Sequence, residues 1–209
     1  MTTDTTAHSA RDDSGRGHDC GACPIRAWPW PVRCRRESSC PCARSALGIH
    51  RFFRSNPSFG TRCATSQWPT GIRRAAAAHT HPYYASELLH DPDRHVRRQA
   101  VKHAPLREIM RLREDADIGV RVAVARRLLG SDLIIMMDDP NHAVRRIVAA
   151  RIPAPMLPLM LGDTDAHVRR VLARRIDAAW LGVLAGDRAL GVRTIAASRL
   201  QWAATMTRN

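Results

Sequence analysis

The sequence predicts an all-α protein, built as a solenoid of 24-residue repeats. Short blocks such as GIRRAAAA, HVRRQAVK and AVRRIVAA recur along its second half, without one insertion or deletion between them. An arginine follows the leading apolar residue of every block, and an aspartate lies 19 residues after each of the first five leading residues. The leading residues are Ile72, Val96, Val120, Val144, Val168 and Val192.

Each block is expected to form a short amphipathic helix. Apolar residues also occupy the fourth and eighth positions after the leading residue in most copies, such as Val148 and Ile152 after Val144. This spacing marks one face of a helix. The recurring aspartate lies just ahead of the helix, in loops such as DPDRH and DTDAH, where its side chain can cap exposed N–H groups.

The segments between these helices are apolar but too short for a long helix. Examples are LIIMM at 133–137 and MLPLML at 156–161. Pro153, Pro155 and Pro158 remove backbone donors in this part of the repeat, which favours 3₁₀ turns or broken helix. One unit cannot bury its own apolar face, whereas stacked units can, so six copies in register predict a solenoid.

The charge of the chain allows two interpretations. The 209 residues carry a formal net charge of +14, almost entirely from arginine, which permits binding to nucleic acid or to an acidic partner. An arginine and an aspartate in every unit can instead form a ladder of ion pairs and carbonyl contacts between neighbouring repeats. Basic residues outside that pattern are better candidates for partner contacts: Arg126, Arg127, Arg174 and Arg175.

No sequence motif of a catalytic site is present. The chain lacks GxSxG, HExxH, Walker-type and GxGxxG patterns, so we expect a protein that is not an enzyme. The N-terminal stretch MTTDTTAHSARDDSGRGHD has no apolar core of a secretory signal, and no run of 18 apolar residues occurs. We therefore expect a cytoplasmic protein with reduced thiols and no membrane partner.

Five of the six cysteines lie close together near the N-terminus, which predicts a metal site. Four thiolates suit either a structural zinc ion or an iron–sulfur cluster, and the spacing does not separate the two. Trp28 and Trp30 favour the cluster, because apolar walls limit the access of water to a redox centre, but they also suit the core of a small subdomain. The five cysteines are Cys20, Cys23, Cys34, Cys40 and Cys42.

The repeats resemble those of the leucine-rich repeat variant proteins, which join an N-terminal [4Fe–4S] domain to 24-residue repeats of the form DP-DxxVRxxVAxRLP. The matching stretches include DPDRHVRRQAVKHAP and DPNHAVRRIVAARIP, and residues 45–59 are similar to the junction of the two parts. The resemblance implies a right-handed superhelix of alternating α- and 3₁₀-helices. It also implies a [4Fe–4S] cluster, with these ligands: Cys20, Cys23, Cys34 and Cys40, or Cys42 as an alternative to Cys40.

These features divide the chain into a disordered tail at 1–18, an iron–sulfur domain at 19–64 and a solenoid of about six repeats at 65–209. The resemblance links the chain to proteins encoded near nitrogen-fixation genes. We expect a redox-linked module that binds a protein partner. Two alternatives stay open: a nucleic-acid-binding protein in which the cluster is a stability element or oxygen sensor, and a passive scaffold with structural zinc.

Overall fold

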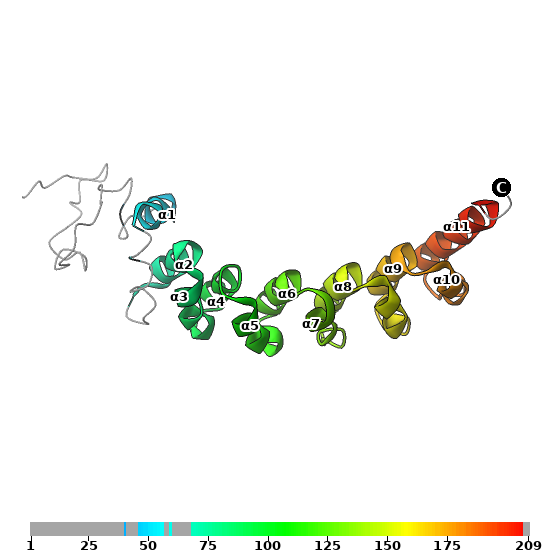
Figure 1. Ribbon diagram of the computed structural model, residues 1–209, viewed down its shortest axis with the longest axis horizontal. Helices are drawn as coiled ribbons and strands as arrows, with labels where there is room; N and C mark the ends of the chain where they lie inside the picture. The colour runs from blue at the N-terminus through cyan, green and yellow to red at the C-terminus, as the bar shows by residue number, and fades with distance from the viewer. Residues whose placement is uncertain (1–39, 41–45, 57–58, 60–67, 207–209) are drawn as a thin grey trace, which may run out of the picture.

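The computed structural model describes Cys40, residues 46–56, Phe59 and residues 68–206. This part of the chain is helical and contains no strand. Helices of successive repeats stack side by side into an elongated arc, with helix α1 at one end and α11 at the other (Figure 1). The predicted all-α repeat fold is therefore confirmed for the described residues. None of their helices is long and apolar enough to cross a membrane.

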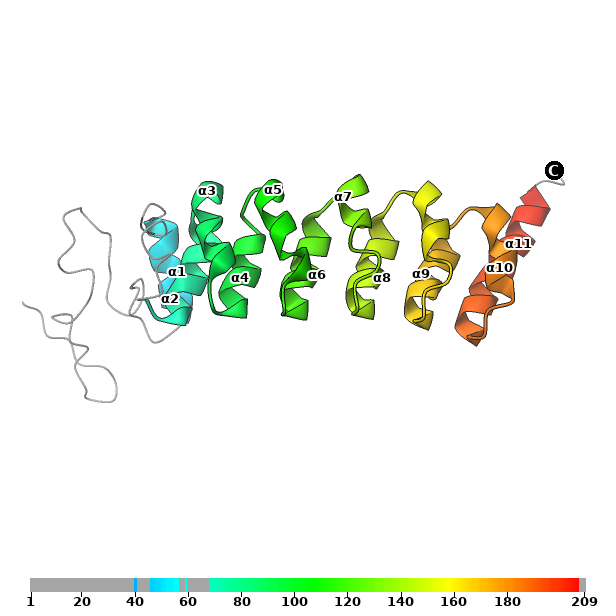
Figure 2. The same ribbon diagram turned by 90° about the horizontal axis from the view of Figure 1, so that it is seen from below.

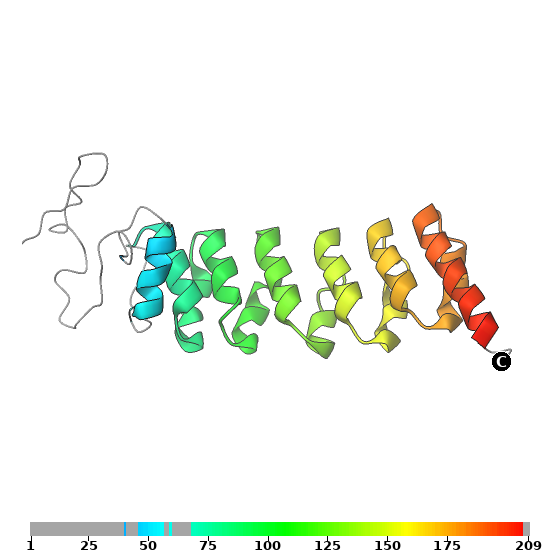
Figure 3. The same cartoon turned by 90° about the horizontal axis from the view of Figure 1, so that it is seen from above.

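Two rows of helices form the arc (Figure 2). The inner row lies on its concave side, where neighbouring helices follow chain order (Figure 3): α1 (Ala46–Ser55), α2 (Thr70–His79), α4 (Arg94–Val101), α6 (Ile118–Arg127), α8 (His142–Arg151), α9 (Ala166–Arg175) and α11 (Leu190–Met206). The outer row lies on the convex side: α3 (Pro82–Ala85), η3 (Glu87–His90), α5 (Leu106–Ile109), η4 (Met110–Glu114), α7 (Gly130–Ile134), η5 (Ala154–Met160) and α10 (Ala178–Ala185).

The outer row contains the expected 3₁₀ turns in three of its units, as η3, η4 and η5. Pro158 lies inside η5 and has no N–H group to donate, which opposes a regular α-helix there. Two units contain no 3₁₀ helix and differ from the prediction, namely the unit of α7 and the one that follows η5. The sequence of the latter, AAWLGVLA, has no proline and forms the eight-residue α-helix α10.

The leading residue of every repeat is buried, as predicted. Ile72 is 5% exposed, Val192 is 1% exposed, and the four leading residues between them are fully buried. Leu157 and Leu181 of the outer row belong to the same apolar cluster as the five leading valines, so the core lies between the two rows. Burying a side chain of this size contributes about 1.5–3 kcal/mol, and each unit gains this only by packing against its neighbours.

The helix caps lie two residues beyond the predicted position. The side chain of Asp93 accepts hydrogen bonds from the N–H groups of His95 and Val96 and so caps α4. Asp91, the recurring aspartate, accepts from the Asp93 N–H at 2.9 Å instead. It precedes the leading residue Val96 by five positions and lies too far from the first turn to cap it. The corresponding caps of α6, α8 and α9 are Asp117, Asn141 and Asp165.

Helix α1 packs against α2 through a second apolar cluster. Phe52 and Phe59 face each other edge to face, with ring centroids 5.2 Å apart, and Phe53 and Ile72 complete the contact. The sequence RFFRSNP, predicted to be a junction, therefore continues the inner row beyond the first repeat. The tail predicted at 1–18 lies outside the described residues.

Candidate functional site

A ladder of buried ion pairs links successive repeats, as the recurring arginine and aspartate predicted. Each arginine reaches the aspartate 18 residues later, with Nε–Oδ2 distances of 2.6–2.8 Å. A second bond joins Nη2 to Oδ1 in every pair, so the contacts are bidentate. The pairs are Arg73–Asp91, Arg97–Asp115, Arg121–Asp139, Arg145–Asp163 and Arg169–Asp187.

The same arginines also hold the loop that precedes their own helix. Nη1 of Arg121 donates to the carbonyl oxygen of Asp115 at 2.8 Å. Arg145 makes the equivalent bond to Asp139 at 2.9 Å. One guanidinium group thus ties together the loops before and after its helix, which fixes the position of each repeat relative to the next.

The ladder lowers the pKa of two of its aspartates, Asp115 and Asp187. The hydrogen bond from Arg169 keeps the pKa of Asp187 below its ordinary value of 3.8, although burial acts in the opposite direction. For Asp115, burial is the largest influence and would raise the pKa. Hydrogen bonds from Arg97 and the Asp117 N–H outweigh it, so that the pKa of Asp115 is lowered. Both carboxylates are therefore charged at neutral pH and are matched by buried guanidinium groups.

A second column of arginines, seven residues after the leading residues, bonds to the main chain of the preceding repeat. Nη1 of Arg127 donates to the carbonyl oxygen of Val101 at 2.6 Å and also to that of Ala104. Carbonyl groups at the C-terminal end of a helix lack partners within it, so these bonds satisfy acceptors that would otherwise need water. The column consists of Arg127, Arg151, Arg175 and Arg199.

The expectation that Arg127 and Arg175 are available to a partner is therefore wrong. Both are half-buried, and their guanidinium groups are bonded to the neighbouring repeat. Their spacing of 24 residues from Arg151 (151 − 127 and 175 − 151) was the signal in the sequence that this column is structural. Arg126 and Arg174 are exposed, and no side-chain hydrogen bond of theirs occurs among the described residues. Their role in partner contacts stays a prediction.

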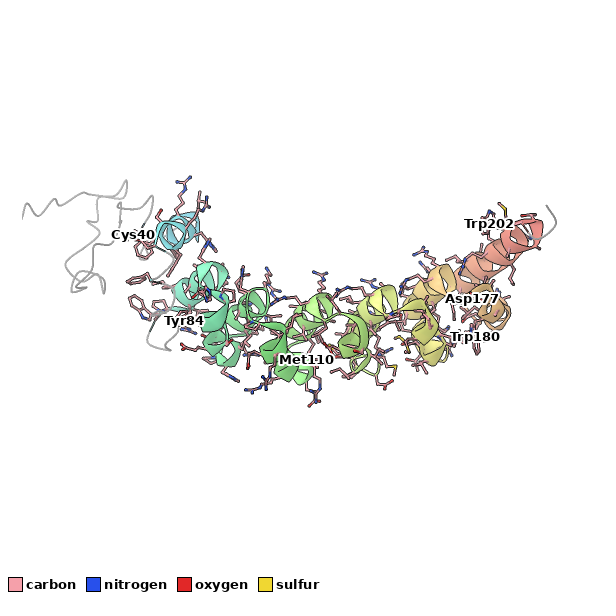
Figure 4. All side chains as sticks on the ribbon, in the orientation of Figure 1. Cys40, Tyr84, Met110, Asp177, Trp180 and Trp202 are labelled. Atoms are coloured by element: carbon pink, nitrogen blue, oxygen red, sulfur yellow. The ribbon has the colours of Figure 1, made fainter. Side chains whose placement is uncertain are left out.

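The solvent side of the inner row is basic. A helix turns by about 100° per residue, so positions two and six after the leading residue point away from the core. Figure 4 shows nitrogen-tipped side chains along this side of the arc. We call the following residues the concave basic face: Arg74, Arg98, Lys102, Arg126, Arg146, Arg170 and Arg174.

Carboxylates are segregated from this face. None of the seven described helices of the inner row contains an aspartate or a glutamate. The acidic residues of the described chain lie in the loops, where they serve the ladder and the caps, or in the outer row, as Glu87 and Glu108 do. The concave basic face therefore carries positive charge that no neighbouring carboxylate of its own row compensates.

Three histidines whose pKa values are lowered lie at the N-terminal end of the inner row. Nδ1 of His50 on α1 lies 3.0 Å from Nε2 of His79 on α2. Burial is the largest cause that lowers the pKa of His50, His79 and His103 below 6.5, and nearby cations lower it further. Arg54 acts on both members of the close pair, and Arg74 acts on His50. A neutral ring is required for the hydrogen bond between the two imidazoles.

The predicted metal ligands are largely outside the described residues; these are Cys20, Cys23, Cys34 and Cys42. Cys40 is described and is buried, with 2% of its surface exposed. Within the described part of the chain, no group of three or more Cys, His, Asp or Glu side chains could hold a metal ion. The ligand set and the [4Fe–4S] cluster stay predictions.

Comparison with known proteins supports the repeat fold. No family model and no curated protein matches the chain. One solved structure, described as "a leucine-rich repeat variant with a novel repetitive protein structural motif", is 29% identical with a TM-score of 0.61. The match covers 85% of this chain and 87% of that chain. The resemblance noted in the repeats thus extends to a similar structure, and the match carries no information on an iron–sulfur domain.

Proposed function

We propose that the protein is a non-catalytic binding module that presents the concave basic face to an anionic macromolecular partner. The proposal rests on the separation of the exposed arginines from the structural arginines. The arginines that hold the repeats together occupy two columns of their own, and the exposed arginines of the inner helices are additional to them. A curved solenoid offers its concave side as an extended binding surface, and guanidinium groups suit carboxylate and phosphate partners.

Binding to labelled poly-L-glutamate tests this proposal. The concave variant combines Arg98→Gln, Arg126→Gln and Arg146→Gln. A matched control, Arg107→Gln with Arg111→Gln and Arg113→Gln, removes the same charge from the outer row, where these three side chains are exposed. We expect the concave variant to lose about tenfold in affinity, since three exposed ion pairs contribute roughly 1.5 kcal/mol.

The control should bind as the unmodified protein does. An equal loss in both variants would mean that net charge alone attracts the polymer, and the concave face would then have no special role.

We also propose that residues 19–64 hold a [4Fe–4S] cluster, with structural zinc as the alternative. The cysteine spacing and the family resemblance support this, and the burial of Cys40 suits a thiolate shielded from water. Anaerobically purified protein should contain about four irons and four sulfides per chain. One zinc per chain without acid-labile sulfide would favour the alternative.

A redox link between the cluster and binding is part of this proposal, as is the association with nitrogen fixation that the resemblance suggests. The affinity for poly-L-glutamate is measured with the protein oxidised and then reduced by dithionite. A difference between the two states supports a redox-linked module. Equal affinity in a protein that retains its iron would assign the cluster a structural role.

A further inference from the structure

The basic residues on the solvent side of the inner row, of which His95 and Arg170 are half-buried and the others exposed, show a longer recurrence than the ladder does. The structural arginines recur every 24 residues. Some cations of the concave basic face are also 24 residues apart, such as Lys102 and Arg126, but their overall pattern recurs once after 72 residues (146 − 74), which is three repeats. HVRRQAVK at 95–102 and HVRRVLAR at 167–174 show the recurrence directly. The matched pairs are Arg74 and Arg146, His95 and His167, Arg98 and Arg170, and Lys102 and Arg174.

These residues form two equivalent clusters on the concave side. The first cluster, on α2 and α4, consists of Arg74, His95, Arg98 and Lys102. The second cluster, on α8 and α9, consists of Arg146, His167, Arg170 and Arg174. Helix α6 lies between them and presents Gly119 and Val122 at the positions where α4 carries His95 and Arg98 and α9 carries His167 and Arg170. The two clusters thus hold most of the cations of the concave basic face, and Arg126 on α6 adds one exposed cation between them.

In each cluster, one arginine packs against a glycine of the following repeat: Arg98 against Gly119, and Arg170 against Gly191. A Cβ atom at Gly119 would lie 2.9 Å from Oδ1 of the capping residue Asp117, and 3.5 Å from Cδ and from Nη1 of Arg98. At Gly191 it would lie 3.4 Å from Nη2 of Arg170. The two glycines are themselves 72 residues apart (191 − 119). Nε of Arg170 is buried without a hydrogen-bond partner among the described residues, so it is a donor for which the described chain supplies no acceptor.

The distance between the two clusters indicates which kind of polyanion fits the concave basic face. Packed helices lie about 8–10 Å apart, so three repeats place the cluster centres about 24–30 Å apart. The outer edges of the two clusters, at Arg74 and Arg170, are four repeats apart, which corresponds to about 32–40 Å. One turn of duplex DNA is about 34 Å long, and the same phosphate backbone returns to the same face after each turn.

Other polyanions fit this arrangement less well. Residues of an extended acidic polypeptide advance by about 3.3 Å each. Such a chain therefore presents charge continuously and does not return it to the same face at the length of one DNA turn. A single nucleic-acid strand is held by aromatic side chains that stack on its bases. Helices α4, α6, α8 and α9 contain no phenylalanine, tyrosine or tryptophan.

We propose that the concave basic face binds the phosphate backbone of a nucleic-acid duplex, with one cluster at each end of about one helical turn. This inference rests on the proposed function, because it names the partner of the same face. The contacts are with phosphates, so binding is expected to depend strongly on salt and little on base sequence.

Fluorescence anisotropy with DNA hairpins tests the inference on the full-length protein. A hairpin stem of 24 base pairs can reach both clusters, whereas one of six base pairs, about 20 Å long, can reach only one. Two variants each disable one cluster: Arg74→Gln with Arg98→Gln, and Arg146→Gln with Arg170→Gln. The control is Arg107→Gln with Arg113→Gln on the outer row, and circular dichroism verifies that all variants fold.

The unmodified protein should prefer the long stem to the short one, to a single strand of equal length and to poly-L-glutamate of equal charge. Each cluster variant should lose this preference for the long stem. It should also reduce the slope of log K against log salt by about 1.8, the value for two phosphates. The control should change neither quantity.

Two results would overturn the inference in distinguishable ways. If all probes bind through the concave face with no preference for the long stem, the partner is not a duplex but the proposed function stands. If the cluster variants bind every probe as the control does, both the inference and the proposed function fail.

Discussion

Arg145 and Arg146 are neighbours in the sequence, yet they belong to two different regions of the molecule. Arg145 is bonded to Asp163 at 2.7 and 2.9 Å and to the carbonyl oxygen of Asp139, and it is largely buried. Arg146 is exposed, and no hydrogen bond of its side chain occurs among the described residues. A rotation of about 100° round the helix separates a residue that holds the repeats together from one that is free for a partner.

The comparison explains how a solenoid can be rich in arginine without using all of it for binding. The ladder and the second column fix the stacking of the repeats, so their period is that of the repeat itself. Exposed positions are free of that constraint and can follow the dimensions of a partner. Hydrogen-bond partners, rather than residue type, therefore separate the structural arginines of this chain from the exposed ones.

The largest effect is expected from the substitution Arg145→Ala, which should destabilise the protein by about 3 kcal/mol. It leaves the Asp163 carboxylate buried without its partner, which costs far more than the pair itself contributes. The matched substitution Arg146→Ala should stay within about 0.5 kcal/mol, as is usual for exposed sites. Urea denaturation followed by circular dichroism measures both.

Binding should show the reverse order. Arg146→Ala should weaken binding to the long DNA stem, whereas Arg145→Ala should not, at a temperature where it is folded. The double substitution Arg145→Met with Asp163→Leu should recover part of the lost stability, because it removes the unpaired buried carboxylate. The recovery is incomplete, since the Asp139 carbonyl oxygen and the Asp165 N–H lose their hydrogen-bond partners. Equal effects of Arg145→Ala and Arg146→Ala on the free energy of unfolding would contradict the distinction between the ladder and the concave basic face.

A smaller effect is expected in the second column. Arg175→Ala removes the donor for the carbonyl oxygens of Ala149 and Ile152, which are 2.5 and 2.9 Å from its guanidinium group. Water can reach part of this half-buried site, so we expect a loss of about 1–2 kcal/mol, less than for the ladder. Arg174→Ala, its exposed neighbour, is the control and should leave the melting temperature unchanged.

The period of the repeats, the buried leading residues and the ladder could all be predicted from the sequence, because each depends on one residue type at one fixed spacing. The role of Arg127 and Arg175 was missed although both lie 24 residues from Arg151, since their acceptors are backbone carbonyls of another repeat and no partner residue type recurs with them. The caps were placed two residues early for a similar reason. The aspartate that recurs in the sequence is bonded to the arginine of the preceding repeat, and a neighbouring polar residue caps the helix.

The candidate site was only half predictable. Arg126 and Arg174 were singled out because two basic residues stand together there, but one member of each pair is structural. The two clusters can be recognised only after the arginines of the ladder and the second column have been excluded. Those structural arginines are identified by their hydrogen bonds, which the sequence does not show. The predicted ligand set falls mostly outside the described residues, so iron and sulfide analysis is its first test.

The smallest effect is expected at the N-terminal end of the inner row, where histidines replace arginines in the second column. Burial and nearby cations lower the pKa of His50 and His79 below 6.5 in the folded state. The unfolded chain therefore binds more protons below this pH, and stability is full above about pH 6.5 and falls as the pH decreases through the lowered values. The melting temperature should decrease modestly between about pH 7.5 and 5.5.

The groups that face this pair are all cationic or neutral among the residues that the structure describes: Arg54, Arg74 and His103. Arg54→Gln removes a charge that lowers the pKa of both His50 and His79, so their folded-state values should rise toward 6.5. The decrease in melting temperature on acidification should then become smaller, although Arg54 is exposed and its loss should not affect stability at neutral pH. A steeper decrease in this variant would show that the cations do not oppose protonation of the pair. Other groups would then have to neutralise the positive charge of Arg54 and Arg74 around His50 and His79.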